Sequence, residues 1–158
     1  MNRAIPRHAF YHAYLVNEWQ PLVTDQIRTL KEAAIETLDL SLFVVTPDPH
    51  AIARLYDIMD REWGLPWVMH TQPIGNEVDG INWMLRRIAY HKHDPEHEAL
   101  LFFHTKGVTK PGHRNIHDWR LMMEHFLIKQ WWRAIDKLAE NYDAVGVNLK
   151  SREPSIPD

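Results

Sequence analysis

The sequence predicts an α/β domain in which a mostly parallel, Rossmann-like sheet carries helices on both faces. Short β-prone runs alternate with longer stretches of helical apolar spacing, a pattern typical of parallel sheets. The chain has 158 residues, 45% hydrophobic and 25% charged, which fits one soluble domain. Sheets of this kind commonly begin with the spatial strand order 3-2-1-4, so we expect that order here.

Five runs of aliphatic, aromatic or β-branched residues predict the strands. They cover residues 9–16, 40–46, 66–70, 99–103 and 144–148.

Four stretches between the strands have helical spacing. We expect helices over residues 17–38, 50–63, 76–88 and 118–140, with Asn17, Asn76 and Asp118 explained as caps or first-turn residues. The third helix carries an apolar stripe of Val78, Ile81, Met84, Leu85 and Ile88. The fourth carries a wide apolar band that includes Phe126, Leu127 and Ile135.

Composition and charge limit the classes of function. We expect one domain over residues 1–150 and a tail over residues 151–158 that is truncated or disordered. The chain has no cysteine, which excludes disulfides and thiolate metal sites. A net charge of -3 gives no electrostatic footprint for nucleic acid. Apolar runs are too short for a membrane span and no secretory segment is visible, so we expect a cytoplasmic location.

The predicted strand order places a ligand crevice between the first and fourth strands. Parallel sheets bind ligands beyond the carboxyl ends of the strands, where the strand order reverses. Two segments should therefore flank one crevice: residues 12–17 and residues 104–107.

The second of these segments changes abruptly from an apolar strand to polar residues. Lys106 can act as a compact cation for a phosphate, and Thr105 can hydrogen-bond one of its oxygens. Gly107 lets the chain turn close to a bound group. Further basic residues follow at positions 110–120, which favours a small polyanion such as a diphosphate. The alternative is a solvated loop with a capped turn.

Several other residues have two readings. Arg120 can point into the crevice or pair with an acid. Asn148 can contact a sugar hydroxyl or simply end a strand. Asn76 and Glu77 are explained by the start of the third helix.

Eleven histidines raise the question of a metal site. His91, His93 and His97 lie in a polar turn at the opposite end of the sheet from the crevice, and they lack the helical spacing of zinc enzymes. A histidine-based metal hydrolase is therefore the third of three functional alternatives, and we assign no metal ligand.

Five motifs occur together in this sequence: YHAYLVNEW at residues 11–19, Asn76-Glu77, LLFFHTKG at residues 100–107, HDWRLMMEHFLIKQWWRAIDKL at residues 117–138, and YDAVGVN at residues 142–148. In combination they resemble a family of bacterial and viral glycosyltransferase-like proteins of surface-polysaccharide synthesis, including the rhamnan-synthesis type. The resemblance runs from about Phe10 to Asn148.

The resemblance implies a GT-A-like fold that binds a nucleotide-sugar donor and acts on a glycan or lipid-linked acceptor. It places His104, Thr105 and Lys106 near the donor diphosphate, and His12 with Tyr14 near the nucleotide. His104-Thr105-Lys106 stands where related enzymes carry an Asp-x-Asp metal motif. A divalent metal cofactor therefore stays open, because Lys106 and its neighbours can neutralise the diphosphate instead.

The family's chain continues after Gly-Val-Asn into an acceptor-side segment, whereas this sequence ends at Asp158. We therefore expect either a truncated chain or a domain that lacks part of the acceptor site, and we name no catalytic residue. The second functional alternative is a non-catalytic binding or assembly module. Trp131 and Trp132 support it, because adjacent helical tryptophans cannot both face inward and an exposed one can join copies of the chain.

Overall fold

The structure is a computed structural model, and it describes residues 5–33, 39–91, 98–105, 108–109, 112, 114–140 and 144–146. Its elements are, in chain order, β1 (Ile5–Tyr14), α1 (Trp19–Glu32), β2 (Asp39–Val45), α2 (Pro49–Ile58), the π-helix η1 (Met59–Trp63), β3 (Trp67–Gln72), α3 (Glu77–His91), β4 (Glu98–His104), α4 (Arg114–Met123), the π-helix η2 (Glu124–Lys129) and α5 (Trp131–Leu138).

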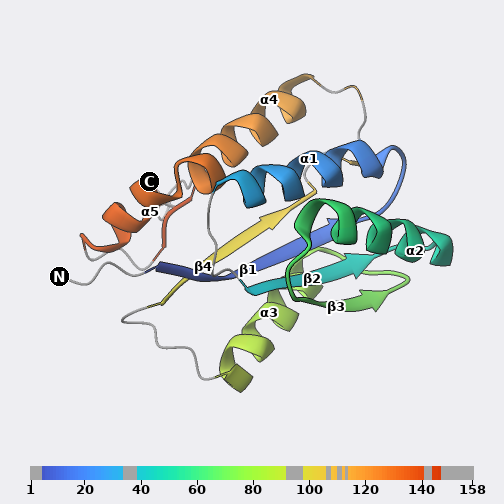
Figure 1. Cartoon of the computed structure of the whole chain (residues 1–158), viewed down its shortest axis with the longest axis horizontal. Helices are drawn as coiled ribbons and strands as arrows, with labels where there is room; N and C mark the ends of the chain where they lie inside the picture. The colour runs from blue at the N-terminus through green and yellow to red at the C-terminus, as the bar shows by residue number, and fades with distance from the viewer. Residues whose placement is uncertain are drawn as a thin grey trace, which may run out of the picture.

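The four strands form one parallel sheet in the order β3-β2-β1-β4. Helix α3 lies on one face of the sheet, while α1, α2, α4 and α5 lie on the other (Figure 1). The expected α/β architecture, with its 3-2-1-4 order and helices on both faces, is confirmed. Because β1 pairs with both β2 and β4, the strand order reverses beside β1.

The main core lies between the sheet and helices α1 and α2. Alternate residues of β1, namely Ala9, Tyr11 and Ala13, are buried there, as the two-residue period of a strand requires. Strand β2 is buried on both faces, which is typical of a central parallel strand. Helix α1 buries one face against this layer, formed by Trp19, Leu22, Val23, Gln26, Ile27 and Leu30.

The start of α1 differs from the expectation that Asn17 caps it. Glu18 holds the N-cap position and makes no capping hydrogen bond. Asn17 instead has a positive φ of 55°, a conformation that asparagine tolerates better than most residues. Its side-chain amide donates to the carbonyl oxygen of Val108 at 2.9 Å. The residue therefore links the segment after β1 to the segment after β4.

Helix α2 begins one residue before the expected position, and together with η1 it ends at residue 63 as expected. Asp48 is its N-cap and accepts a hydrogen bond from the amide of His50 at 2.9 Å, and Pro49 occupies the first turn. The following π-helical turn ends at Gly64, whose φ of 67° stops the helix.

Helix α3 matches the expected apolar stripe only in part, because Ile81, Met84 and Ile88 are half-buried and the other two residues are not. Val78 and Leu85 of the predicted stripe are exposed. Gly80 is buried instead, and Trp83 packs with its ring centroid 5.8 Å from that of Phe43. Gly80 and Trp83 lie one turn apart on the helix face that meets the sheet, where the glycine lets the backbone approach and the indole ring packs on Phe43.

The C-terminal helical region begins before Asp118 and is interrupted at Gln130. Asp118 lies one turn inside α4 and faces Arg114 at 3.8 Å, so it does not start the helix. The π-helical hydrogen bonds of η2 shift the register of the side chains. Ile128 and Ile135 are buried, whereas Phe126 is 41% exposed, so the expected apolar band is only partly correct.

The expected fifth strand is not formed over residues 144–146, and residues 147–148 lie outside the described residues. Val145 and Gly146 instead line a cavity of about 260 Å³ together with Phe126 and Leu127 of η2. The described part of the sheet therefore consists of four strands. None of the described helices has both the length and the apolar character needed to cross a membrane.

A buried chain of polar side chains joins β1, α1 and η2. The Tyr11 hydroxyl donates to Gln26 Oε1 at 2.6 Å, and Gln26 Nε2 donates to Glu124 Oε1 at 3.0 Å. Burial, reinforced by the charge of Glu124 and opposed by Arg120, raises the pKa of Tyr11 well above its ordinary value. The Tyr11 phenol therefore keeps its proton and acts as the first donor of this hydrogen-bonded series.

Replacing Gln26 removes the central residue of the hydrogen-bonded series that joins Tyr11 to Glu124. We expect Gln26→Leu to lower the free energy of unfolding by about 1–3 kcal/mol, because the Tyr11 hydroxyl and the Glu124 carboxylate lose a partner inside the core. Urea denaturation measures the change. In the Tyr11→Phe background the same substitution should cost less, and an equal cost in both backgrounds would contradict the coupling.

Candidate functional site

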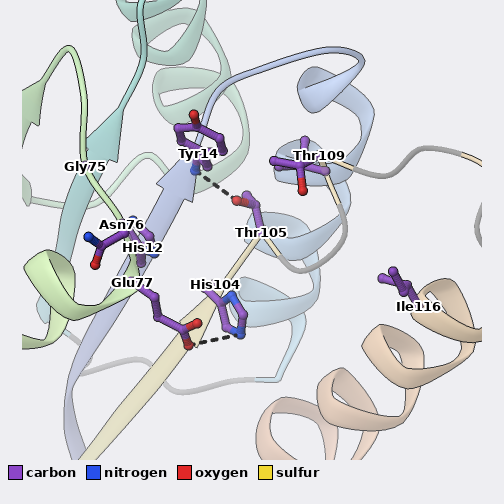
Figure 2. Close-up of a pocket in the computed structure, with 10 residues that line it drawn as sticks. His12, Tyr14, Gly75, Asn76, Glu77, His104, Thr105, Thr109 and Ile116 are labelled. Carbon is purple, nitrogen blue, oxygen red and sulfur yellow. Dashed lines mark hydrogen bonds and ion pairs between the residues drawn. The ribbon is translucent and has the colours of Figure 1, made fainter.

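A pocket of about 430 Å³ lies at the carboxyl ends of β1 and β4 (Figure 2). The two strands and the segment after β4 form one part of its lining, with His12, Tyr14, His104, Thr105, Val108 and Thr109. The start of α3 contributes Gly75, Asn76 and Glu77, and the first turn of α4 contributes Ile116. The crevice expected at the switch point is therefore present.

Thr105 holds the two strand ends together. Its amide donates to the His12 carbonyl oxygen at 3.1 Å, and its hydroxyl oxygen accepts from the Tyr14 amide at 2.8 Å. Figure 2 shows the second of these hydrogen bonds. The tips of the first and fourth strands lie side by side, as expected, and the Thr105 oxygen has one lone pair engaged by the backbone.

His12 is a buried imidazole in the pocket wall. It is 6% exposed, and it pairs with His104 on one side and with Phe43 on the other in the strand register. Its Nε2 atom has no hydrogen-bond partner among the described residues. The ring thus has hydrogen-bonding capacity that the described part of the chain does not use.

The electrostatics of His12 favour its neutral form. Burial is the main cause that lowers its pKa, and the neighbouring His104 lowers it further. The carboxylates of Glu77 and Asp79 act in the opposite direction but do not reverse the shift. At neutral pH the ring is an uncharged donor and acceptor.

Helix α3 approaches His12 closely because residue 80 is glycine. A Cβ atom at this position would lie 3.2 Å from both Cδ2 and Cγ of His12. The absence of a side chain allows the first turn of α3 to reach the sheet. This approach brings the pocket residues of α3 into range of β1 and β4.

Glu77 and His104 face one another across the pocket (Figure 2). Glu77 Oε1 lies 3.6 Å from His104 Nε2, and the Glu77 side chain is 49% exposed. The capping of α3 sets this orientation. Asn76 Oδ1 accepts from the Val78 amide at 2.8 Å, and Asp79 Oδ2 accepts from the Asn76 amide at 2.8 Å, which confirms Asn76 as the cap.

The structure brings together four of the eight residues predicted for the site. His12, Tyr14, His104 and Thr105 line the pocket. Arg120 is not among the lining residues. Its Nη2 atom lies 2.8 Å from His117 Nδ1, and its Nε atom lies 3.7 Å from Glu124 Oε1. Of the two predicted possibilities, the structure therefore has Arg120 paired with an acid.

The remaining predicted residues, Lys106, Gly107 and Asn148, lie outside the described residues. Glu77 is a site residue that sequence reasoning missed, since its place in the first turn of a helix already explained it. One signal could have identified it: α3 connects β3 to β4, so the start of α3 lies at the carboxyl ends of the strands, beside the point where the strand order reverses.

A metal site gains no support from the described part of the chain, where no group of three or more His, Asp or Glu side chains is arranged to hold a metal ion. His91 is the last residue of α3, at the end of the helix remote from the pocket. His93 and His97 lie outside the described residues.

The lowered pKa of His12 predicts a pH dependence of stability. Below its ordinary pKa of 6.5 the unfolded chain binds a proton that the folded chain does not, so stability falls as the pH drops from 6.5 toward the folded pKa. We expect His12→Phe, which keeps a ring beside Phe43, to lose less stability than the unmodified chain between about pH 7.5 and about pH 5.5.

Urea denaturation at the two pH values measures this difference. His50→Gln, at an exposed position, is the matched control and should retain the full pH dependence. An unchanged pH dependence in His12→Phe would show that the imidazole titrates alike in both states.

Comparison of the chain with family models, with curated proteins and with solved structures finds no match. The resemblance to glycosyltransferase-like proteins thus rests on the sequence motifs, and the function it implies stays a prediction.

Proposed function

We propose that this chain is a glycosyltransferase-like domain that binds a nucleotide-activated sugar for glycan synthesis. The observation that carries the proposal is the pocket at the carboxyl ends of β1 and β4, beside the strand where the 3-2-1-4 order reverses. Open parallel sheets bind their ligands at such points. Its volume of about 430 Å³ suits a small-molecule ligand.

The lining residues suggest how the donor would be held. The half-buried Tyr14 offers an aromatic ring to the nucleotide. Thr105 accepts from the Tyr14 amide, so its own hydroxyl proton is available for a phosphate oxygen. Lys106 follows Thr105 directly in the sequence and supplies a cation for the same diphosphate.

These roles match the electrostatic demand of glycosyl transfer. The bond between the anomeric carbon and the diphosphate oxygen breaks, so negative charge develops on the departing diphosphate. The acceptor oxygen bonds to the same carbon and loses its proton. A positioned ammonium and a hydroxyl donor stabilise the departing group more strongly as its charge grows, which lowers the barrier.

Nucleotide binding tests the proposal directly. Titration calorimetry with UDP, GDP and dTDP, each alone and with a hexose attached, should find at least one ligand with a Kd of about 1 mM or tighter. In that complex Lys106→Ala should weaken binding by about 1.5–3 kcal/mol, the size of a charge-assisted hydrogen bond.

Lys31→Ala is the matched control, because Lys31 is an exposed lysine at the end of α1, remote from the pocket. It should leave the affinity unchanged. Absence of binding for every nucleotide would refute the proposed function, and equal losses for the two lysines would refute the assigned role of Lys106.

A second function is favoured by the two tryptophans at the start of α5. Trp131 is partly buried and its Nε1 donates to the Ala33 carbonyl oxygen at 3.4 Å, whereas Trp132 is 45% exposed. One tryptophan of the pair is therefore outward, as expected. The exposed ring of Trp132 offers an apolar contact to a second copy of the chain, as an assembly module would require.

Sedimentation at increasing protein concentration tests this alternative. If Trp132 anchors an interface, the mass rises with concentration, and Trp132→Ala weakens association by about 2 kcal/mol, as loss of a hot-spot residue does. Tyr90→Ala removes an 81% exposed aromatic from the other face of the sheet and should have no effect. A constant monomer mass would eliminate this interface.

A further inference from the structure

The α3 end of the pocket has an unusual charge for a site that receives a polyanion. Among the described lining residues there is one carboxylate, Glu77, and no lysine or arginine. The charge of Asp79, in the same first turn of α3, also reaches His12. A phosphate group at this end would meet two negative charges, whereas the end formed by Thr105 and the segment after it lacks a carboxylate among the described residues.

The Glu77 carboxylate retains acceptor capacity. At 3.6 Å, its approach to His104 is an ion-pair distance and is too long for a hydrogen bond. The side chain is half exposed and points across the pocket toward β4 (Figure 2). An ionised carboxylate accepts several hydrogen bonds, so it can bind two neighbouring hydroxyl groups of one ligand.

His12 adds a second polar group with unused capacity. It lines the pocket, it is buried, and its Nε2 atom has no partner among the described residues. A polar atom held away from water without a partner is costly, and a ligand that supplies the partner recovers that cost. A hydroxyl group suits it best, because it can donate to or accept from a neutral imidazole in either tautomer.

We propose that Glu77 and His12 form the subsite for the sugar of the donor, and that this subsite selects an uncharged, hydroxyl-rich sugar over one that bears a carboxylate. The inference rests on the proposed nucleotide-sugar function and adds the class of sugar. The sugar hydroxyls donate to the Glu77 carboxylate, while the diphosphate lies toward Thr105. A uronic acid would bring a second carboxylate against Glu77.

A matched pair of ligands separates the sugar from the nucleotide. UDP-glucose and UDP-glucuronic acid differ by one carboxylate, and GDP-mannose and GDP-mannuronic acid form the guanosine pair. For the nucleotide that binds, the ratio of the two Kd values should favour the neutral sugar by at least about tenfold in the unmodified chain. Titration calorimetry measures both.

Two variants of Glu77 test its role. Glu77→Gln removes the charge, so it should shift the ratio at least about tenfold toward the uronic acid, and the nucleoside diphosphate alone should bind equally well or better. Glu77→Asp keeps the charge on a shorter side chain, so it should still reject the uronic acid while binding the neutral sugar more weakly. Glu32→Gln, an exposed residue at the far end of α1, should change nothing.

The outcomes separate this inference from the proposed function. If no nucleotide binds, the proposed function and the subsite are both refuted. If a nucleoside diphosphate binds but Glu77→Gln leaves the ratio unchanged, only the subsite is refuted. Circular dichroism and thermal denaturation of each variant show whether α3 is still folded, and Glu77→Asp tests the same subsite with the first-turn charge retained.

Discussion

The site depends on the hydrogen bonds by which Thr105 joins the ends of β1 and β4. Its amide and hydroxyl engage the backbone of His12 and Tyr14, beyond the last register pair of the two strands, His12 and His104. Asn17 adds a further link to Val108. These hydrogen bonds hold together two segments that are about ninety residues apart in the sequence. They thereby position the pocket residues of both segments relative to one another.

The two faces of the sheet are stabilised in different ways. On the α1 face, apolar side chains surround the buried polar chain of Tyr11, Gln26 and Glu124, which ties η2 to the sheet. On the other face, rings pack from strand to strand, and Trp83 of α3 lies over Phe43. The pocket lies at the carboxyl ends of β1 and β4, and its lining includes none of the residues that form the main core except Tyr14 and Val108 at its margin.

The sequence predicted the strand order and the location of the pocket, because alternation of strands and helices with parallel pairing leaves few topologies. It also identified His12, Tyr14, His104 and Thr105, which follow from strand ends. It did not identify Glu77, since the capping of α3 explained that residue without a ligand. The predictions for Asn17, Val78, Leu85 and Phe126 were wrong for related reasons: tertiary contacts and a π-helical turn override local propensity and simple helical spacing.

Gly80 controls the width of the pocket from outside it. The backbone of α3 packs directly on the His12 ring, in the space that the Cβ atom of any other residue would need. The absence of this one carbon therefore sets how closely α3 approaches the sheet. A bulkier residue there would lift the helix and carry Glu77 away from His104 while leaving every lining side chain intact. Ligand preference could thus drift in evolution through a packing position that never touches the ligand.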